Sequence, residues 1–394
     1  MTFASGLRVA MVCGYRPTPA GGGTEKYVYE LSAGLLQRGV HVEIICEDRP
    51  FLPDAENLLA KNIVGVSPYA LSGTSGPDRY WEKSRQFAHA IQPARYDLVH
   101  CHGQYGYHTA LRWAQLARRP PLIATFHLTA LGPIQRYRAL GLSEPDEARV
   151  DRTVAIMEEA MGRLADRCIA VSQGVADELV ELYGVPSDRV EPIHNWYDAN
   201  VFRPMDQQFA RAVLGLTPRR QYLLYVGHFN MARGKIMADV LRRLPKHITL
   251  VVVHHETDKA IVEEFGERVK FTGHLGPREM ALHYCAADLL CFPALYGGFG
   301  LVLIESMACG CPPVVFNYSA MNEVVTGDSG YMVEEPSAAA YAAKIQLALA
   351  EGSAKSSAAM VRAKAFNMKT QIDAILDVYR DCVSPVSTLA RSVS

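Results

Sequence analysis

Histidines stand at the ends of two apolar segments in the first half of the chain. Residues 98–101 lead into His102, and residues 122–126 lead into His127. If both segments are parallel strands, their carboxyl ends share one edge of a sheet, where ligands of such folds bind. Imidazole at that edge can donate to a sugar hydroxyl or stabilise charge near a leaving phosphate. We therefore predict a catalytic role for His102 and an acceptor-side role for His127.

Positive side chains follow an apolar segment of the second half. Residues 222–226 lead into Gly227 and His228, and Arg233 and Lys235 then open a helix-length segment. Arginine makes planar two-pronged contacts with phosphate and lysine contributes a point charge, while a helix N-terminus adds free N–H groups. This segment is predicted to hold a diphosphate. Arg233 would stabilise the charge that develops on the diphosphate as it leaves. A solvated basic turn is the alternative.

Two glycine-rich turns also precede helix-length segments. Gly22 and Gly23 come before residues 25–38, and the run 297–300 comes before residues 301–308. Glycine lets a backbone approach a phosphate closely, and the helix start supplies a positive dipole end. The first turn lacks the Gly-x-Gly-x-x-Gly spacing, so a dinucleotide site is not indicated. A plain flexible turn remains the alternative for it.

Glu305 stands on an otherwise apolar helical segment. A buried carboxylate needs partners to offset its lost hydration. A ribose diol is one suitable partner, because an ionised carboxylate accepts hydrogen bonds from two hydroxyls. A salt bridge within its own domain is the other interpretation.

The elements that must position these residues follow an alternating pattern. Short apolar runs alternate with amphipathic helix-length runs along the whole chain, which indicates parallel α/β units. The predicted strands are 7–13, 40–46, 98–101, 122–126 and 168–171 in the first half, and 222–226, 250–253, 269–272, 289–292 and 313–316 in the second. Predicted helices include 25–38, 278–287, 301–308 and 370–382.

This pattern divides into two doubly wound domains. We predict a first domain of residues 1–200 joined by the final segment 370–394, and a second domain of residues 201–369, with a linker over 195–204. Residues 51–80, rich in Gly, Pro and Ser, are expected to form a mobile loop, and the tail after residue 385 to be disordered. In such folds ligands bind where the carboxyl ends of the strands open into a crevice.

The overall composition argues against several classes of protein. The 394 residues carry a formal net charge of −1, which argues against a sequence-independent grip on nucleic acid. The nine cysteines form no Cys-x-x-Cys pair, as expected for buried thiols in a reducing cytoplasm. No run of about 18 apolar residues and no signal peptide is found, so a cytoplasmic protein without a membrane span is expected.

Together these segments resemble the retaining GT-B glycosyltransferases of family 4, the glycogen-synthase-like sugar transferases. The matching segments are Gly22-Gly23, Asp97…His102, Val171-Ser172…Tyr183-Gly184-Val185-Pro186…Arg189-Val190, Asn195…Phe202-Arg203-Pro204, Tyr225-Val226-Gly227, Phe271-Thr272-Gly273, Ala287-Asp288, Phe292-Pro293 and Gly298-Phe299-Gly300-Leu301…Glu305-Ser306-Met307-Ala308-Cys309-Gly310. The resemblance implies an α/β fold of two Rossmann-like doubly wound domains facing a central cleft, with the C-terminal helix crossing back to the N-terminal domain.

The resemblance also assigns roles. It implies a UDP- or GDP-linked sugar as donor substrate, held mainly by the C-terminal domain, an acceptor on the N-terminal domain, and no cofactor or metal. Glu305 matches the glutamate that binds ribose, and Arg233 stands at the position of a diphosphate-binding lysine. His102 matches a histidine that reaches the donor sugar. The further donor-binding candidates are Gly22, Gly23, His228, Lys235, Gly273, His274, Leu275, Gly297, Gly298, Phe299, Gly300 and Leu301.

Four departures from the family pattern matter. The first glutamate of the Glu-x7-Glu motif is Gly297 here, which opens space and favours a bulky, deoxygenated or amino-substituted sugar. The diphosphate arginine is His228, a loss of a charge-assisted contact. Trp196 follows the linker asparagine where glycine is usual, and residues 254–256 replace a Gly-x-Gly turn.

The mechanism expected from the resemblance is front-face transfer with retention. No Asp-x-Asp motif occurs, which fits cationic side chains and helix dipoles neutralising the diphosphate instead of a metal. The leaving diphosphate would take the acceptor proton, so no enzymic nucleophile is required. The alternatives are a non-catalytic GT-B nucleotide-binding partner protein and, more weakly, an epimerase or a phosphorylase.

The acceptor side carries fewer signals. Tyr105 is the aromatic residue we place there, where it would stack on a ring. With no basic amphipathic patch, a small soluble acceptor from antibiotic-type specialised metabolism is favoured. An aminocyclitol and a thiol giving an S-glycoside are both left open, as are the base of the donor and a homodimeric state.

Overall fold

The computed structural model describes residues 6–19, 21–47, 58–66, 77–143, 152–229 and 232–384, and the chain divides into two compact units. The first contains Met1–Ile134, Val150–Asn195 and Lys369–Ser394, and the second contains Gln135–Arg149 and Trp196–Met368. The chain passes from the first unit to the second between residues 195 and 196. It also passes between them within helix α4 (Gly132–Ala139).

The first unit is a seven-stranded parallel sheet. Its spatial order is β3-β2-β1-β4-β5-β6-β7, so the order reverses between β1 and β4. The strands are β1 (Arg8–Tyr15), β2 (His41–Glu47), β3 (Ile63–Val66), β4 (Leu98–His102), β5 (Leu122–Phe126), β6 (Arg167–Ala170) and β7 (Val190–Pro192). The neighbouring helices are α1 (Gly23–Gln37), α2 (Pro77–Ala90), α3 (Tyr107–Trp113), α5 (Arg152–Leu164), α6 (Gln173–Tyr183) and α15 (Met368–Val383).

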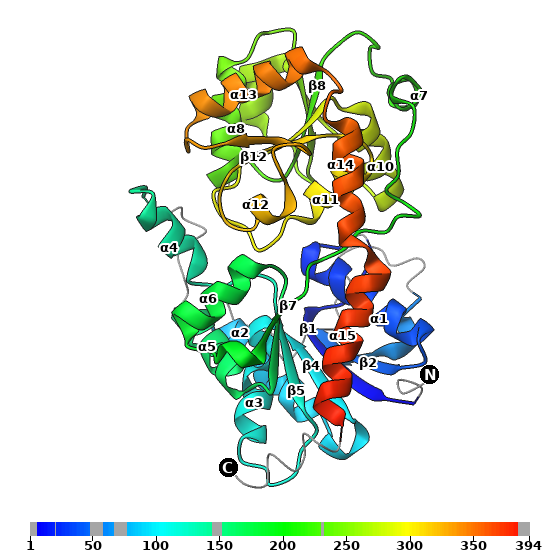
Figure 1. The fold of residues 1–394 in the computed structure, drawn as a ribbon, viewed down its shortest axis with the longest axis vertical. Coiled ribbons are helices and arrows are strands. Elements are labelled where there is room, and N and C mark those ends of the chain that lie inside the picture. The colour runs from blue at the N-terminus through cyan, green and yellow to red at the C-terminus, as the bar shows by residue number, and fades with distance from the viewer. Residues whose placement is uncertain are drawn as a thin grey trace. The chain divides into compact units, whose positions relative to one another are not determined.

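Helix α15 packs within the first unit although it is the last helix of the chain (Figure 1). A Cβ atom built on Gly34 of α1 would lie 2.4 Å from Cδ1 of Ile372 of α15, so the two helices pack closely at this glycine. Arg38 donates to Asp373 over 2.7 Å, and the Tyr379 hydroxyl lies 2.7 Å from His100 Nδ1 on β4. The return of the C-terminal helix to the N-terminal domain is thereby confirmed.

The second unit is a six-stranded parallel sheet with the order β10-β9-β8-β11-β12-β13, which reverses between β8 and β11. Its strands are β8 (Tyr222–Val226), β9 (Thr249–Val253), β10 (Val269–Phe271), β11 (Leu289–Phe292), β12 (Pro313–Phe316) and β13 (Tyr331–Val333). Its helices are α7 (Gln207–Val213), α8 (Ala232–Arg243), α9 (Lys259–Phe265), α10 (Pro277–Ala286), α11 (Leu301–Ala308), α12 (Met321–Val324), α13 (Ala338–Glu351) and α14 (Ser356–Ala363). The prediction of two doubly wound α/β domains is confirmed.

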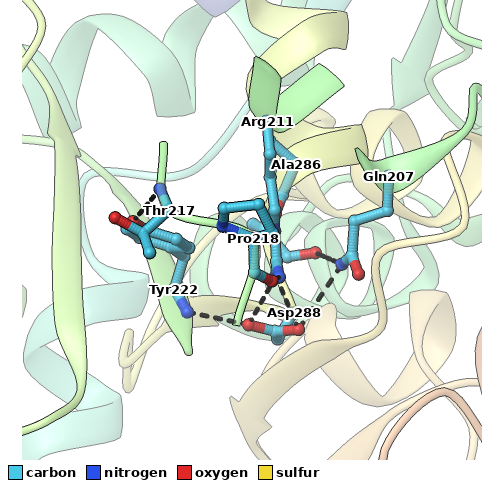
Figure 2. Close-up of polar contacts among 8 residues, drawn as sticks. Gln207, Arg211, Thr217, Pro218, Tyr222, Ala286 and Asp288 are labelled. Atoms are coloured by element: carbon cyan, nitrogen blue, oxygen red, sulfur yellow. Dashed lines mark hydrogen bonds and ion pairs between the residues drawn. The ribbon is translucent and has the colours of Figure 1, made fainter. Parts of the chain in front are cut away.

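An arginine fixes the amino ends of two central strands in the second unit (Figure 2). Arg211 of α7 places Nη2 2.9 Å from both oxygens of Asp288, which precedes β11. Its Nε donates to the Ala286 carbonyl over 2.9 Å and its Nη1 to the Pro218 carbonyl over 2.7 Å. Asp288 also accepts from the backbone N–H of Tyr222 at the start of β8 over 2.7 Å. At this end of the sheet, the Arg211–Asp288 ion pair and its hydrogen bonds therefore connect the starts of β8 and β11.

The region predicted as a mobile loop, residues 51–80, contains regular structure. Strand β3 pairs with β2, and α2 begins at residue 77. That prediction is wrong over these residues, because the apolar residues of β3 pair at the sheet edge despite the Gly- and Ser-rich sequence around them. Residues 51–57 and 67–76, like the tail from residue 385, lie outside the described residues.

All nine cysteines of the chain are free and buried. Burial raises the pKa of Cys168 to about 12 and raises those of Cys101 and Cys291 further. They act as small apolar core residues, as the sequence indicates.

Candidate functional site

Arg233 lies where the strand order of the second unit reverses. Its guanidinium carbon is 5.6 Å from the centre of the Phe292 ring at the end of β11. Nε and an Nη atom would each lie 3.1 Å from a Cβ built on Gly227, which has φ +149° after β8. The Gly227 turn therefore has no room for a side chain on this side. Within the described part of the chain, Arg233 makes no ion pair, and its buried Nε has no hydrogen-bond acceptor.

His228 stands five positions before this arginine in the sequence but faces a different group. Its Nε2 lies 3.4 Å from Glu256 Oε2, and its ring meets His254 edge-on with centroids 4.3 Å apart. These three residues and Phe271 line an open pocket of about 290 Å³ at the carboxyl ends of β8, β9 and β10. The sequence did not single out Glu256 as a partner of His228.

Lys235 does not join Arg233. Two helical positions apart, the two side chains leave α8 about 200° from one another. Lys235 is exposed and lines a separate depression with Asp239, Asp258 and Glu264. Arg233 alone of the two basic residues lies beside the Gly227 turn.

The base-reading candidates lie beside the histidine pocket. Gly273 has φ +80° and forms a backbone bridge with His254. His274 is exposed and Leu275 is half-buried. Their backbone groups are therefore at the edge of the sheet that β9 and β10 form.

The second glycine turn connects β11 to α11. Gly300 has φ +86° and a Cβ there would lie 2.9 Å from Leu303, so glycine is required at this position. At Gly297 the nearest atom to an added Cβ is Met321 Sδ at 3.6 Å, an ordinary contact. The Gly297 carbonyl accepts from Ser319, which itself adopts φ +53°. A side chain at position 297 is thus sterically permitted, whereas one at position 300 is not.

The remaining residues of this turn lead to Glu305. Phe299 is buried against Phe366, Gly298 is buried, and Leu301 opens α11 half-buried. Glu305 is 5% exposed and accepts a hydrogen bond of 3.0 Å from the Tyr284 hydroxyl. The carboxylate therefore has a hydrogen-bond donor within its own unit, a tyrosine hydroxyl rather than the cation of the predicted salt bridge.

In the first unit, the predicted histidines are in contact. His102 Nδ1 lies 3.0 Å from His127 Nε2. Burial lowers the pKa of His127 to about 4. Burial, followed by the charges of His100 and His127, lowers that of His102 well below its usual value. His100 lies beneath them with its pKa lowered to about 3, mainly by burial. At neutral pH this cluster is uncharged.

The first glycine turn lies near the histidine cluster through Tyr27. Gly22 caps α1 and Gly23 begins it, and both are exposed. One turn further along α1, the Tyr27 ring meets His127 edge-on at 4.7 Å and His102 at 5.7 Å. The amide groups at the start of α1 are therefore near the edge of the sheet where the histidines end their strands.

Tyr105 belongs to a different cluster. A Cβ on Gly14 would lie 2.2 Å from its ring, so the tyrosine packs against the backbone near the end of β1. Lys83 Nζ lies 5.8 Å from that ring and 2.6 Å from Glu47 Oε2, with both charges buried. Although burial opposes ionisation, the contacts with Lys83 and Arg79 lower the pKa of Glu47. No local sequence pattern indicates this ion pair, because its partners come from β2 and α2.

Beyond His127, the chain is fixed by a carboxyl group. Glu158 of α5 accepts from the Ala130 N–H over 2.7 Å and from the Tyr183 hydroxyl over 2.6 Å. Burial raises its pKa to about 7, although these two hydrogen bonds oppose the rise. Glu158 thus positions the loop that follows the acceptor-side histidine.

Comparisons with known proteins agree with this architecture. The model of Glycosyltransferase Family 4 matches residues 21–201, and that of Glycosyl transferases group 1 matches residues 220–351. The D-inositol 3-phosphate glycosyltransferase of Nocardia farcinica is 31% identical, covering 79% of this chain and 73% of that protein. The enzyme of the same name from Mycobacterium marinum is 29% identical, covering 92% of this chain and 82% of its own.

Solved structures show the same fold. Sucrose-phosphate synthase from Thermosynechococcus elongatus superposes with a TM-score of 0.80 at 23% identity, covering 95% of this chain and 98% of that one. Anabaena HepE in complex with UDP and glucose superposes with a TM-score of 0.71 at 17% identity, covering 95% and 100%. In the described part of the chain, no helix is long and apolar enough to cross a membrane.

The sequence matches extend over both halves of the chain, and the matching structures share its two doubly wound sheets. The protein therefore belongs to glycosyltransferase family 4 and is a glycosyltransferase of GT-B fold.

Proposed function

We propose that this enzyme transfers a sugar, with retention of the anomeric configuration and without a metal, from a nucleoside diphosphate donor to a small soluble polyol. The second unit would hold the donor and the first unit the acceptor. Arg233 would neutralise charge on the diphosphate, and His102 would position the sugar.

One observation carries this proposal: Arg233 has no counter-ion within the described residues, and its buried Nε has no acceptor. A buried donor left unsatisfied costs about 1–3 kcal/mol, and more when the group is charged. An anionic ligand at the Gly227 turn would remove that cost. A diphosphate also suits the planar two-pronged geometry of guanidinium.

The identity of the two substrates is supported by the relatives. Two structures of Anabaena HepE hold UDP and UDP-glucose. By their names, the similar mycobacterial and nocardial enzymes act on D-inositol 3-phosphate. We therefore favour a UDP-sugar as donor and a cyclitol-type acceptor over a thiol. The absence of a side chain at Gly297 supports a donor sugar that is bulky, deoxygenated or amino-substituted, as in specialised antibiotic-type metabolism.

The test begins with calorimetric titration of UDP, GDP, ADP and dTDP, each with magnesium and with EDTA. One diphosphate should bind with the same affinity under both conditions. Transfer from the matching nucleotide sugars to myo-inositol and inositol 3-phosphate is then followed by NMR, which also reports the product anomer. An inverted product contradicts the mechanism, and binding that depends on magnesium contradicts metal independence.

A non-catalytic nucleotide-binding role is the second candidate, favoured by the contact of His228 with Glu256. His228 stands where the family pattern places an arginine, and the Glu256 carboxylate lies 3.4 Å from its ring, so the diphosphate would meet a negative charge beside it. Diphosphate binding without turnover of any nucleotide sugar would support this candidate. Turnover by the purified chain alone would exclude it.

A further inference from the structure

The protons of the histidine cluster follow from its geometry. His102 ends β4, and the neighbouring strand places Thr125 opposite it, two residues before His127. The rings of His102 and His127 are inclined by only 18°, with Nδ1 of the first and Nε2 of the second 3.0 Å apart. One proton lies in this contact, and either imidazole can supply it.

A methionine decides which imidazole supplies it. The other nitrogen of His102, Nε2, lies 3.1 Å from the sulfur of Met11 on β1. A thioether carries no proton and only accepts hydrogen bonds. The contact is therefore a hydrogen bond only if His102 carries its proton on Nε2. A neutral imidazole has a single proton, so His102 Nδ1 is bare and accepts from His127 Nε2–H.

The same count leaves His127 Nδ1 without a proton. Burial keeps both rings neutral at pH 7, because it lowers the pKa of each. His127 is half-buried at the carboxyl end of β5, and no group of the described residues hydrogen-bonds to its Nδ1. His100, held between Tyr379 and Thr125, stacks on His102 with centroids 4.7 Å apart and limits its rotation.

We infer that Met11 fixes the tautomers of His102 and His127, so that His127 presents Nδ1 as a pure hydrogen-bond acceptor to the substrate. Such a nitrogen binds a hydroxyl, an amine or a thiol. It repels phosphate and carboxylate oxygens, which offer only lone pairs. His127 then selects a hydroxyl-bearing part of a polyol, and Met11 is a positioning residue. The choice of substrate group rests on the proposed function, whereas the tautomers do not.

The tautomers are measured by two-bond ¹H–¹⁵N spectra of the full-length protein labelled with ¹⁵N-histidine at pH 7. His102→Asn and His127→Asn variants assign the two rings. Both should carry the proton on Nε2, and the His127 Nδ1 signal should have the shift of an unprotonated nitrogen. A proton on His127 Nδ1 in the wild type would overturn the inference.

Met11→Leu tests the role assigned to the thioether. It should release His102, so that His127 shows a mixture of both tautomers. Met157→Leu, at a buried methionine of α5, is the matched control and should leave the wild-type tautomers. An unchanged His127 in the Met11 variant would remove Met11 from the proposal. Inorganic phosphate at pH 8 should leave the His127 Nδ1 shift unchanged, and a change would contradict its exclusion of phosphate oxygens.

Two variants at position 127 test the substrate contact. Asparagine places a carbonyl near the position of Nδ1, whereas glutamine places its amide near Nε2 and leaves Nδ1 unreplaced. In the transfer assay, kcat/KM of His127→Asn should exceed that of His127→Gln by about tenfold, the value of one neutral hydrogen bond. The opposite order would overturn the substrate contact. If no donor is turned over at all, the proposed function fails while the spectra still decide the tautomers.

Discussion

The two ends of the sheet in the second unit hold two arginines in opposite situations. At the amino ends of β8 and β11, Arg211 donates to Asp288 and to two backbone carbonyls (Figure 2). At the carboxyl ends, Arg233 packs on Gly227 and Phe292 with no acceptor for its buried Nε in the described chain. The first arginine completes the fold. The second has no counter-ion among the described residues, which is why we propose it, and not Arg211, as the residue that binds an anionic ligand.

The largest effect is expected from Arg211→Ala. Removing the guanidinium leaves two carbonyls without their donor and Asp288 without its counter-ion, so the free energy of unfolding should fall by about 3–5 kcal/mol. Urea denaturation of the wild type and the variant measures this. Arg278→Ala, at an exposed position of α10, should stay within about 0.5 kcal/mol of the wild type. A loss below about 1 kcal/mol in Arg211→Ala would contradict the structural role of the network.

Arg233→Ala should show the reverse pattern. Its free energy of unfolding should change little, because among the described residues the guanidinium packs on the Phe292 ring and has no counter-ion. Affinity for the diphosphate that binds the wild type should fall by roughly tenfold to a hundredfold, as for a hydrogen bond to a charged group. Calorimetry measures this, with Lys235→Ala as a control of equal charge change on another face of α8. Equal losses in both variants would show that only net charge matters.

Glu158 extends this comparison, because it is a buried carboxyl group with no cation beside it among the described residues. The pKa of Glu158 is raised to about 7, so folding favours its protonated form. This stabilisation is complete below the unfolded pKa of about 4.5 and is lost as the pH rises through 7. The free energy of unfolding should therefore fall by roughly 2 kcal/mol from this group between pH 5 and pH 7.5.

Glu158→Gln removes this titration and keeps the shape of the side chain. The difference in the free energy of unfolding between pH 5 and pH 7.5 should be smaller in this variant than in the wild type by roughly 2 kcal/mol. Glu181→Gln, at an exposed position of α6, should keep the wild-type difference. If Glu158→Gln also keeps the wild-type difference between the two pH values, Glu158 is ionised in the folded state at pH 7.

The smallest effect on folding is expected at Gly297. A Cβ atom there would meet only Met321, at ordinary contact distance, so Gly297→Glu should stay within about 0.5 kcal/mol of the wild type. Transfer from UDP-glucose should improve relative to the natural donor, because a carboxylate can accept sugar hydroxyls. Gly300→Ala is the contrasting control and should lose about 1–2 kcal/mol at its φ of +86°. Strong destabilisation by Gly297→Glu would show that this glycine serves the backbone.

The sequence was sufficient for the fold where the signal is local. The apolar runs of β5, β8, β11 and β12 and the helix α11 have the predicted bounds, because each is a short buried segment between turn residues. The edge strands β3, β7 and β13 have only three or four residues and were not predicted. Their pairing depends on the neighbouring strand rather than on their own composition.

The candidate site was only partly predictable for the same reason. Histidines at strand ends and glycines before helices are local patterns, and His102 and His127 are in contact. The grouping of Lys83 with Glu47, of Met11 with His102 and of Glu158 with Tyr183 joins residues 25 to 91 positions apart. Lys235 was grouped with Arg233 by nearness in sequence, although helical geometry separates their side chains.

Because all nine cysteines are buried, their thiols should react slowly with sulfhydryl reagents in the native protein. Any cysteine introduced at an exposed position would then be the single fast-reacting site, without removal of the natural ones. With one dye or spin label on each unit, the distance between the two labels would report domain movement during turnover. The slow modification of the natural thiols would, in the same sample, serve as a clock for unfolding.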